Sequence, residues 1–502
     1  MERSKTTFCL LIFFLLVTFA IFLKVNESKK IKIGNYNVIL IIVDDLRPDH
    51  LGCYGYSKKI SPNIDKLARD SYVFENSFSQ AGYTLPSTIS ILTSVYPVSH
   101  NMFFVYKDRL SSRIPTMAEV FSFYDYKTAW FSLLHEPHLD IDAGFGRGFQ
   151  VMGELEQSLD GLEEIISWIE KNKSKKMFLA IDTRSVHNYS RFFRKINSGK
   201  NFNADMLKVN EEYYYKLVAA AKSKKAPFNN PAIIRNHREL FNGVYRKDKE
   251  NEIEDLLNLK NRYEVGLIRT SLYASFVRDF GFKHHEDWIK AYDTAIEYTD
   301  EKLIKSILNK INSSKLNDKT IIIITADHGE AFGEHGLYGH GWNVFDEFIH
   351  VPLIIKVPHQ KGRKIKALVQ NIDIMPTVLE LTGIPCPHQA QGKSLFSLFS
   401  KTNAPPVHEY IFSGGKVQCT IRSLDWKFII NYKVDDRFFY HLTSDPKEKN
   451  NLYDQNRDFA LKFESKIKAW EKSFPSYKDK EYSFSPEIDK AVQEKIRKTG
   501  YW

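Results

Sequence analysis

Residues 37–45 of this chain, NVILIIVDD, decide the fold that the sequence predicts. The run that opens with Asn37 is almost uninterruptedly apolar and leads directly into Asp44 and Asp45. Because it lacks the alternation of a half-exposed strand, it predicts a strand that is buried on both faces. Two adjacent carboxylates at the end of such a strand repel each other unless positive charge lies between them. A divalent cation is the natural partner, although the pair could also cap the next turn or face water.

Further short apolar runs recur along the chain, separated by polar segments of helix length. They lie at 128–131, 177–181, 320–325 and 351–356. Together they predict an α/β fold with a mainly parallel central sheet and helices on both of its faces. In open sheets of this kind the ligand site lies beyond the carboxyl ends of the strands. We therefore expect the chemistry of this protein at those strand ends.

A second strand end also carries metal-binding groups, since Asp327 and His328 closely follow the run at 320–325. An isolated Asp-His pair is more often a surface turn than a pair of ligands. Two acidic strand ends in one chain favour a metal site, because three carboxylates with one imidazole are a common ligand set for a divalent cation. Oxygen ligands suit Ca²⁺, Mg²⁺ or Mn²⁺, and the imidazole favours Mn²⁺ or Zn²⁺. The identity of the ion stays open.

A third element, residues 83–92, reads YTLPSTISIL and predicts the start of a helix. Pro86 suits the first turn, where its missing N–H costs nothing. Thr84 would then lie at or just before the helix start, with its hydroxyl over free backbone N–H groups that stabilise an anion or a developing alkoxide. The competing interpretation is a plain threonine N-cap with no part in chemistry.

Taken together, these three elements resemble the sulfatase family of the alkaline phosphatase superfamily. The resemblance covers roughly residues 37–502, thins between about 190 and 285, and rests on long motifs in the family's order. They are residues 44–56, 61–68, 92–97, 327–336, 340–341, 351–354, 373–377 and 442–452. The resemblance implies an alkaline-phosphatase-like fold and a metal-dependent hydrolase or transferase.

Position by position, the resemblance also implies roles for individual residues. Thr84 stands where the family has its nucleophile. His187 stands where the family often has a histidine near the bound ester, and His340 stands where it has a lysine or histidine. By their chemistry these histidines could hold the anion or protonate the leaving group, although a lone histidine is more often structural. The implied metal ligands are Asp44, Asp45, Asp327 and His328.

The departures from the family pattern concern the nucleophile and its neighbours. The family has a Cys or Ser that is oxidised to formylglycine, followed by x-Pro-x-Arg, whereas this chain has Thr84 and, in the place of the arginine, Thr88. The family's lysine-containing stretch is also missing, and residues 131–137 occupy that region. Because threonine cannot give the same aldehyde, Thr84 would act as a plain alkoxide with metal assistance. In this it resembles lipoteichoic acid synthases and phosphoethanolamine transferases.

The sequence thus predicts a sulfatase-like hydrolase or transferase that acts on sulfate or phosphate esters of an extracytoplasmic glycan or lipid head group. The family favours sulfate, and the threonine favours phosphate because a phospho-threonine is resolved more easily. The alternative is a non-catalytic relative that binds anionic glycans. The loss of the arginine and the lysine favours that alternative, and the retained ligand set argues against it.

Composition excludes several other classes of protein. The chain has 502 residues and a net charge of +10, but its lysines are scattered, so we expect no nucleic-acid partner. Four cysteines are too few and too dispersed for a disulfide framework, and they form no cluster of zinc-binding spacing.

The first residues predict export. Basic residues precede an apolar run at Phe8–Leu23, which is short for a membrane span but long for a signal peptide. We expect residues 1–24 to form a retained signal anchor that attaches the chain to a membrane, with a cleaved signal peptide as the alternative.

The remaining chain is expected to form one large catalytic domain, residues 35–400, and a C-terminal subdomain, residues 401–502. A charged helical insertion is predicted at about 203–287, and short strands from about 404 onward predict a small antiparallel sheet with a polar helical tail.

Overall fold

A computed structural model describes residues 31–103, 108–133, 143–156, 158–187, 189, 285–400 and 404–477. The helical insertion predicted at about 203–287 lies outside these residues apart from its end. The polar tail beyond 477 also lies outside them.

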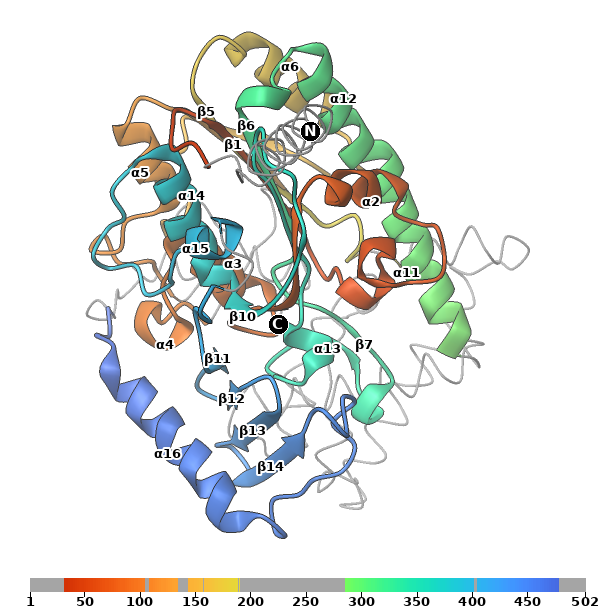
Figure 1. Ribbon diagram of the computed structural model, residues 1–502, viewed down its shortest axis with the longest axis vertical. Coiled ribbons are helices and arrows are strands. Elements are labelled where there is room, and N and C mark those ends of the chain that lie inside the picture. The colour runs from red at the N-terminus through yellow and green to blue at the C-terminus, as the bar shows by residue number, and fades with distance from the viewer. Residues whose placement is uncertain are drawn as a thin grey trace, which may run out of the picture.

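The centre of the molecule is an eight-stranded sheet in the order β10-β2-β9-β6-β1-β5-β3-β4 (Figure 1). Strand β9 pairs antiparallel with β2 and β6, and the other neighbouring strands pair in parallel. The prediction of an α/β fold with a mainly parallel sheet is therefore confirmed. The strands are β1 (Asn37–Val43), β2 (Tyr72–Phe78), β3 (Lys127–Ser132), β4 (Val151–Glu154), β5 (Met177–Thr183), β6 (Thr320–Thr325), β9 (Leu353–Lys356) and β10 (Lys364–Gln370).

Helices cover both faces of this sheet, as the unbroken apolar strands require. In β1, Ile39 and Ile41 pack into one hydrophobic cluster while Val38 and Leu40 pack into the opposite one. The first cluster includes helices α2 (Pro62–Arg69), α6 (Leu162–Asn172), α11 (His285–Thr299) and α12 (Lys305–Ser313). The second includes α3 (Thr84–Thr93), α5 (Met117–Phe123), α14 (Ile374–Thr382) and α15 (Phe396–Ser400) (Figure 1).

Shorter elements connect these layers. A π-helical turn, Asp300–Ile304, joins α11 to α12. A small antiparallel pair, β7 (Ala331–Phe332) with β8 (Tyr338–Gly339), lies between β6 and β9 in sequence. The remaining helical segments are Pro48–His50, Gly52–Tyr54, α4 (Pro97–His100), Asn317–Lys319, Glu334–Gly336, α13 (Asp346–Ile349) and Asn371–Asp373.

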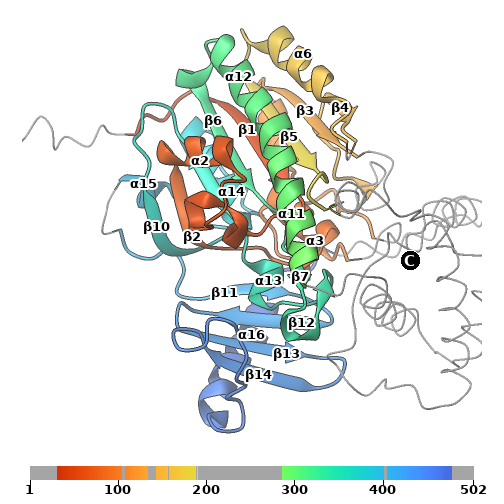
Figure 2. The ribbon, with the colours of Figure 1, turned by 90° about the vertical axis from the view of Figure 1, so that its right-hand side faces the viewer.

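A second sheet of four antiparallel strands packs below the first one and against helix α16 (Arg457–Ser473) (Figure 2). Its order follows the sequence: β11 (Ile411–Gly414), β12 (Gln418–Arg422), β13 (Trp426–Asn431) and β14 (Asp436–His441). The predicted small C-terminal antiparallel sheet is therefore confirmed. The domain limits 35–400 and 401–502 stay a prediction.

The prediction of a transmembrane signal anchor is corrected here. Among the residues that the structure describes, no helix combines the length and the apolar character needed to cross a membrane. The run at Phe8–Leu23 itself lies outside the described residues. An apolar run of that length is compatible with a targeting segment as well as with an anchor, and we drop the anchor and the membrane attachment that followed from it.

Candidate active site

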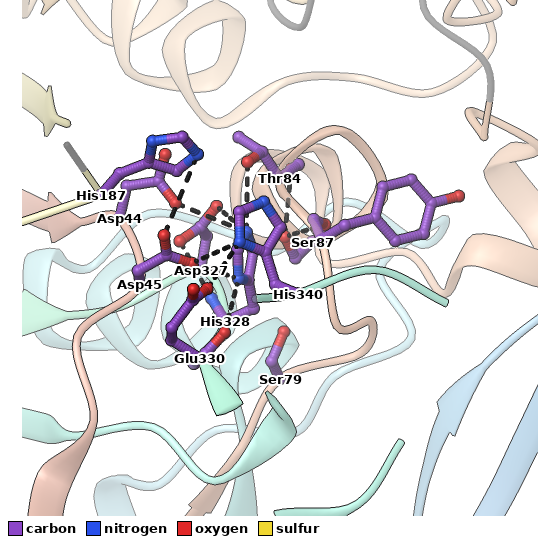
Figure 3. A network of polar contacts seen from close by, with 12 residues as sticks. Asp44, Asp45, Ser79, Thr84, Ser87, His187, Asp327, His328, Glu330 and His340 are labelled. Carbon is purple, nitrogen blue, oxygen red and sulfur yellow. Dashed lines mark hydrogen bonds and ion pairs between the residues drawn. The ribbon is translucent and has the colours of Figure 1, made fainter. Parts of the chain in front are cut away.

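Three neighbouring strands of the large sheet end at the same place and carry most of the predicted site residues. Strand β1 lies between β5 and β6 and runs parallel to both, with Val43 opposite Thr183 and Ile42 opposite Thr325. The segments after these strands therefore emerge side by side at one edge of the sheet. They carry Asp44, Asp45, His187, Asp327 and His328, which converge in one cluster (Figure 3).

The turn after β1 aims both of its carboxylates into the cluster. Successive residues of a strand point to opposite faces, so two adjacent aspartates need a change of backbone direction to point the same way. Asp45 provides it with a φ of 67°, in the left-handed region that non-glycine residues seldom adopt. The Tyr292 hydroxyl from α11 fixes this turn, because it donates to the Asp45 carbonyl at 2.6 Å and accepts from the Arg47 N–H at 2.8 Å.

His328 is the centre of the carboxylate cluster. Its Nδ1 lies 2.9 Å from Asp45 Oδ1 and 3.0 Å from the Gly329 carbonyl oxygen, two acceptors that favour a proton on this nitrogen. Its Nε2 lies 3.4 Å from oxygens of both Asp44 and Asp327. Imidazoles that bind metals usually donate their second nitrogen to a carboxylate or a carbonyl in this way.

The carboxylates of the cluster fit a divalent cation. Asp44, Asp45 and Asp327 are at most 1% exposed. Within the part of the chain that the structure describes, both oxygens of Asp44, Oδ2 of Asp45 and Oδ2 of Asp327 have no hydrogen-bond donor. Buried carboxylate oxygens are normally hydrogen-bonded or bound to metal. Asp44, Asp327 and His328 could hold an ion directly, because one ligand atom from each lies within 4.8 Å of the others.

Electrostatics in the cluster also indicate an excess of negative charge. Burial raises the pKa of Asp327 well above its ordinary value, and the charge of Asp44 adds to this shift. Burial opposes protonation of His328, yet the carboxylates of Asp327 and Asp45 raise its pKa to about 10. One further cation is close, since Arg184 Nε lies 3.5 Å from Asp44 Oδ2.

Thr84 contacts this cluster from helix α3 and not from a strand end. It is the first residue of α3, and Tyr83 is the N-cap residue, so the hydroxyl of Thr84 makes no capping hydrogen bond. Instead, Thr84 Oγ1 lies 3.1 Å from His328 Nε2 (Figure 3). Thr84 therefore lies at the start of the helix, as the sequence predicted. Its hydroxyl, however, faces the candidate metal ligands and not the helix N–H groups.

His187 and His340 form the more exposed side of the site. Their rings are 5.0 Å apart, and their side chains are 10% and 19% exposed, respectively. His187 Nε2 lies 3.9 Å from Asp45 Oδ2, and His340 Nδ1 lies 3.2 Å from Asp45 Oδ1. Both predicted histidines thus join the same cluster as the carboxylates.

Glu330 is a site residue that sequence reasoning missed. Its buried carboxylate accepts from His340 Nδ1 at 2.7 Å and from the Tyr189 hydroxyl at 2.9 Å. The pairing follows from the hairpin of β7 and β8, in which Ala331 lies opposite Gly339, so the residues just outside that pair meet. Such a two-residue strand gives little signal in a sequence. Arg184 was missed too, because it follows β5 without a motif of its own.

The structure shows what occupies the position where the family has its arginine, which is Thr88 in this chain. Its side chain is buried, and its hydroxyl lacks a hydrogen-bond partner among the described residues. This position on α3 therefore supplies no positive charge to the site. Most of the region 131–137, where the family's lysine is missing, lies outside the described residues.

Comparison with known families decides the identity of this fold and site. The family model named Sulfatase matches residues 36–384, well over half of the chain. The chain belongs to the sulfatase family. A second model, the C-terminal region of N-sulphoglucosamine sulphohydrolase, matches residues 333–472. As a member of this family, the chain is a sulfuric ester hydrolase-type enzyme.

Individual relatives agree with the family assignment. The chain is 24% identical over 504 residues to an N-acetylglucosamine-6-O-sulfatase of Bacteroides thetaiotaomicron, covering 88% of this chain and 87% of that one. It is 26% identical over 424 residues to the human iduronate 2-sulfatase, covering 70% of each. The crystal structure of a phosphonate monoester hydrolase of Agrobacterium radiobacter has the same fold, with a TM-score of 0.60, 18% identity and coverage of 86% and 95%.

Proposed function

We propose that this chain is a metal-dependent hydrolase of sulfate or phosphate esters on a glycan, with Thr84 as its nucleophile. The observation that carries the proposal is the position of Thr84 Oγ1, 3.1 Å from His328 Nε2 and at the edge of three buried carboxylates. A hydroxyl at the start of a helix, next to a cluster that fits a cation, is suited to become an alkoxide.

Four residues would hold one divalent cation in this proposal: Asp44, Asp45, Asp327 and His328. The donor-free carboxylate oxygens and the Nδ1 contacts of His328 support the assignment. When bound, the cation lowers the pKa of the Thr84 hydroxyl and offsets the negative charge of the ester. The donor set does not choose among Ca²⁺, Mg²⁺, Mn²⁺ and Zn²⁺.

The reaction then needs two displacements at the sulfur or phosphorus atom. Thr84 Oγ1, after giving its proton to water, forms a bond to that atom while the bond to the sugar oxygen breaks. The leaving oxygen takes a proton from His187 or His340, the two more exposed imidazoles. Water then attacks the same atom and gives a proton to the imidazole that lost one, while the bond to Thr84 Oγ1 breaks. This oxygen takes up a proton, and sulfate or phosphate is released.

Glu330 supports His340 in this scheme. Its carboxylate accepts from Nδ1 at 2.7 Å and so turns Nε2 of the same ring away from Glu330, where it can reach a leaving group. Glu330 does not touch the substrate and is a positioning residue. The pair has the geometry of an imidazole held in one orientation by a buried carboxylate, which is frequent in general acid–base catalysis.

The choice between sulfate and phosphate has support on each side. Relatives named for N-acetylglucosamine 6-O-sulfate and iduronate 2-sulfate chemistry support sulfate on a glycan. Thr84 supports phosphate, because it cannot become the aldehyde through which formylglycine enzymes release sulfate, and a phospho-threonine is easier for water to cleave. Thr88, which leaves the family's arginine position without charge, does not favour either group.

The test is a parallel assay of an aryl sulfate, an aryl phosphate and an aryl phosphodiester, with and without added divalent ions. We expect turnover of at least one ester that depends on the ion. Thr84→Ala should lower kcat by several powers of ten, at about 1.4 kcal/mol in barrier height for each. Thr84→Ser should retain part of the activity, because the hydroxyl remains.

Thr93→Ala is the matched control for this substitution. Thr93 ends the same helix and is equally buried, but its hydroxyl only donates to the Ile89 carbonyl. It should keep normal kcat. Near-normal turnover in Thr84→Ala would exclude the covalent mechanism.

We also propose that the protein is exported by means of its first residues. Basic residues followed by the apolar run Phe8–Leu23 are typical of a segment that directs secretion. Amino-terminal sequencing of the protein recovered outside the cytoplasm tests this, and a protein found only in the cytoplasm would contradict it.

A further inference from the structure

An aromatic surface lies beside Thr84 and is used by none of the steps above. Tyr83 directly precedes Thr84, and Trp342 follows His340 by two positions. The two half-buried rings lie 4.7 Å apart. Phe103, which is buried, stacks on Trp342 at 6.0 Å with an angle of 20° between the ring planes.

The surface is held firmly in relation to the reacting hydroxyl. The Gly341 N–H donates to the Gly82 carbonyl at 2.9 Å, which binds the loop before Thr84 to the loop after His340. This approach needs glycine at position 82, because a Cβ there would lie 2.3 Å from the Asn343 carbonyl oxygen. The Tyr83 hydroxyl also donates to the Phe103 carbonyl at 3.2 Å.

The C-terminal sheet adds a positive charge to the same surface. The turn between β11 and β12 lies on Phe103, where a Cβ at Gly415 would be 2.4 Å from the ring. Lys416 in this turn is exposed, and its Nζ lies 4.8 Å from the centroid of the Phe103 ring. Trp342 and Lys416 thus both lie against Phe103, and Tyr83, which contacts Trp342, directly precedes the nucleophile.

We propose that Tyr83, Trp342 and Lys416 form a subsite for the sugar of an acidic glycan that carries a second anionic group. The proposal rests on the proposed function. Sugar rings have apolar faces of C–H groups that pack on aromatic rings, and partly exposed aromatic groups with a few polar groups around them are typical of ligand sites. The Lys416 ammonium would pair with a second sulfate or a carboxylate on the same glycan.

The charge of Lys416 also favours an acidic glycan over a lipid head group that carries a positive charge. Ethanolamine and choline head groups carry a positive charge of their own, which Lys416 would repel. A glycan with two acidic groups is attracted at both ends, by the cation site near Thr84 and by Lys416. The subsite thus narrows the proposed glycan substrate to an acidic glycan.

The test measures binding to a protein that cannot turn over its ligand. Calorimetry on full-length Thr84→Ala would use a panel of sulfated hexosamines and uronic acids, each with one or two anionic groups. Adding Trp342→Ala should weaken the tightest Kd about tenfold, a loss of about 1.4 kcal/mol. Trp342→Phe should recover most of that affinity, which excludes a folding defect as the cause.

Lys416→Gln tests the second half of the subsite. It should weaken binding of doubly anionic sugars about threefold to fivefold and of singly anionic sugars by less, as expected of a partly exposed ion pair. Phe123→Ala, which alters a ring that is 82% exposed, is the control and should bind as the parent does.

Three results would overturn the subsite. These are no binding of any sugar in the panel, a Kd within twofold of the parent after Trp342→Ala, or tighter binding of phosphoethanolamine than of the doubly anionic sugars. The proposed function fails separately, because it requires turnover by the wild-type protein. An inactive wild type with intact, Trp342-dependent sugar binding would refute the reaction and leave the subsite standing.

Discussion

Two buried acidic clusters in this protein differ in how their charge is balanced. The site cluster, Asp44, Asp45 and Asp327, has carboxylate oxygens without hydrogen-bond donors in the described part of the chain. The second, which we call the clamp, consists of Asp346, Glu448, Arg422 and Lys427 and brings its own cations. It joins α13, close to the His340 loop, to the C-terminal sheet.

The acidic and basic side chains of the clamp form short ion pairs with one another. Lys427, fully buried, lies 2.7 Å from Asp346 Oδ1 and 2.6 Å from Glu448 Oε1, and Arg422 lies 3.0 Å from Asp346 Oδ2. Burial alone would raise the pKa of Asp346, but Arg422 and Lys427 hold it well below its ordinary value. At Glu448 the effect of burial exceeds that of the Lys427 charge, and the pKa of this carboxyl is raised to about 7.

The balance of charge distinguishes a buried acidic cluster that stabilises the fold from one that binds a cation. Asp346 is stabilised in its charged form by groups of the chain itself, whereas burial and the charge of Asp44 raise the pKa of Asp327. The site cluster has one arginine, Arg184, beside three carboxylates, and a buried cluster with such an excess of negative charge costs stability unless something else supplies positive charge. We therefore interpret the clamp as structural and the site cluster as the place for a cation.

The largest expected effect comes from breaking the clamp. Lys427→Met would leave two buried carboxylates without their shared ammonium, and the free energy of unfolding should fall by about 3–5 kcal/mol. Chemical denaturation measures the loss. Lys447→Met, which changes an exposed lysine next to Glu448, is the control. A loss no larger than that of the control would show that the clamp does not hold the two parts together.

Two buried histidines extend the comparison between balanced and unbalanced charge. His328, among carboxylates, has a pKa raised to about 10, whereas burial lowers the pKa of His100 to about 3. His100 Nδ1 accepts from the Met102 N–H, and Nε2 lies 3.2 Å from the Pro86 carbonyl, so its neutral form is the stable one.

The sign of the pH dependence follows from these contacts. Between the unfolded pKa of 6.5 and the folded pKa of about 3, the unfolded chain binds a proton at His100 that the folded chain does not. Stability from this group is therefore complete above pH 6.5 and is lost as pH falls, by at most about 1.4 kcal/mol per pH unit. His100→Gln should flatten the slope of Tm against pH in this window. An unchanged slope would contradict the assignment.

The smallest effect concerns the site cluster without its ion. In protein treated with a chelator, Asp327→Asn removes one of three crowded carboxylates and keeps the shape of the side chain. Its free energy of unfolding should stay level or rise by up to about 1 kcal/mol, because like charges are separated. Denaturation of chelated wild-type and variant protein measures this. A loss comparable with that of Lys427→Met would mean that the site cluster is structural after all.

The central sheet could be predicted in large part, because its buried strands are continuous apolar runs in the sequence. The runs at 37–43 and 320–325 became β1 and β6 with those same bounds, and their acidic ends met because the two strands are parallel neighbours. Strand β2 was not predicted, since Glu75 and Asn76 interrupt its apolar character. The run at 351–356 became β9, but its antiparallel direction depends on tertiary pairing that no local pattern records.

The sequence predicted which residues lie together where they follow the ends of strands, and it could not predict contacts that only the folded chain creates. Asp44, Asp327 and His328 follow strands, and the structure brings them together as expected. The contact of Glu330 with His340 depends on a hairpin of two-residue strands, and the clamp joins Asp346 to residues 76 to 102 positions away. The membrane anchor was wrong for a simpler reason, because hydrophobicity and length at residues 8–23 suit more than one kind of segment.

The metal content of the protein, measured together with its stability, shows most directly whether the site cluster binds a cation. Metal-free wild-type protein would be titrated with Ca²⁺, Mg²⁺, Mn²⁺ and Zn²⁺, with elemental analysis of the washed product and Tm as readouts. We expect one ion per chain and a higher Tm on binding, both lost in Asp327→Asn and both kept in the clamp variant Arg422→Gln. Equal metal content in wild type and Asp327→Asn, or no rise in Tm with any ion, would contradict it.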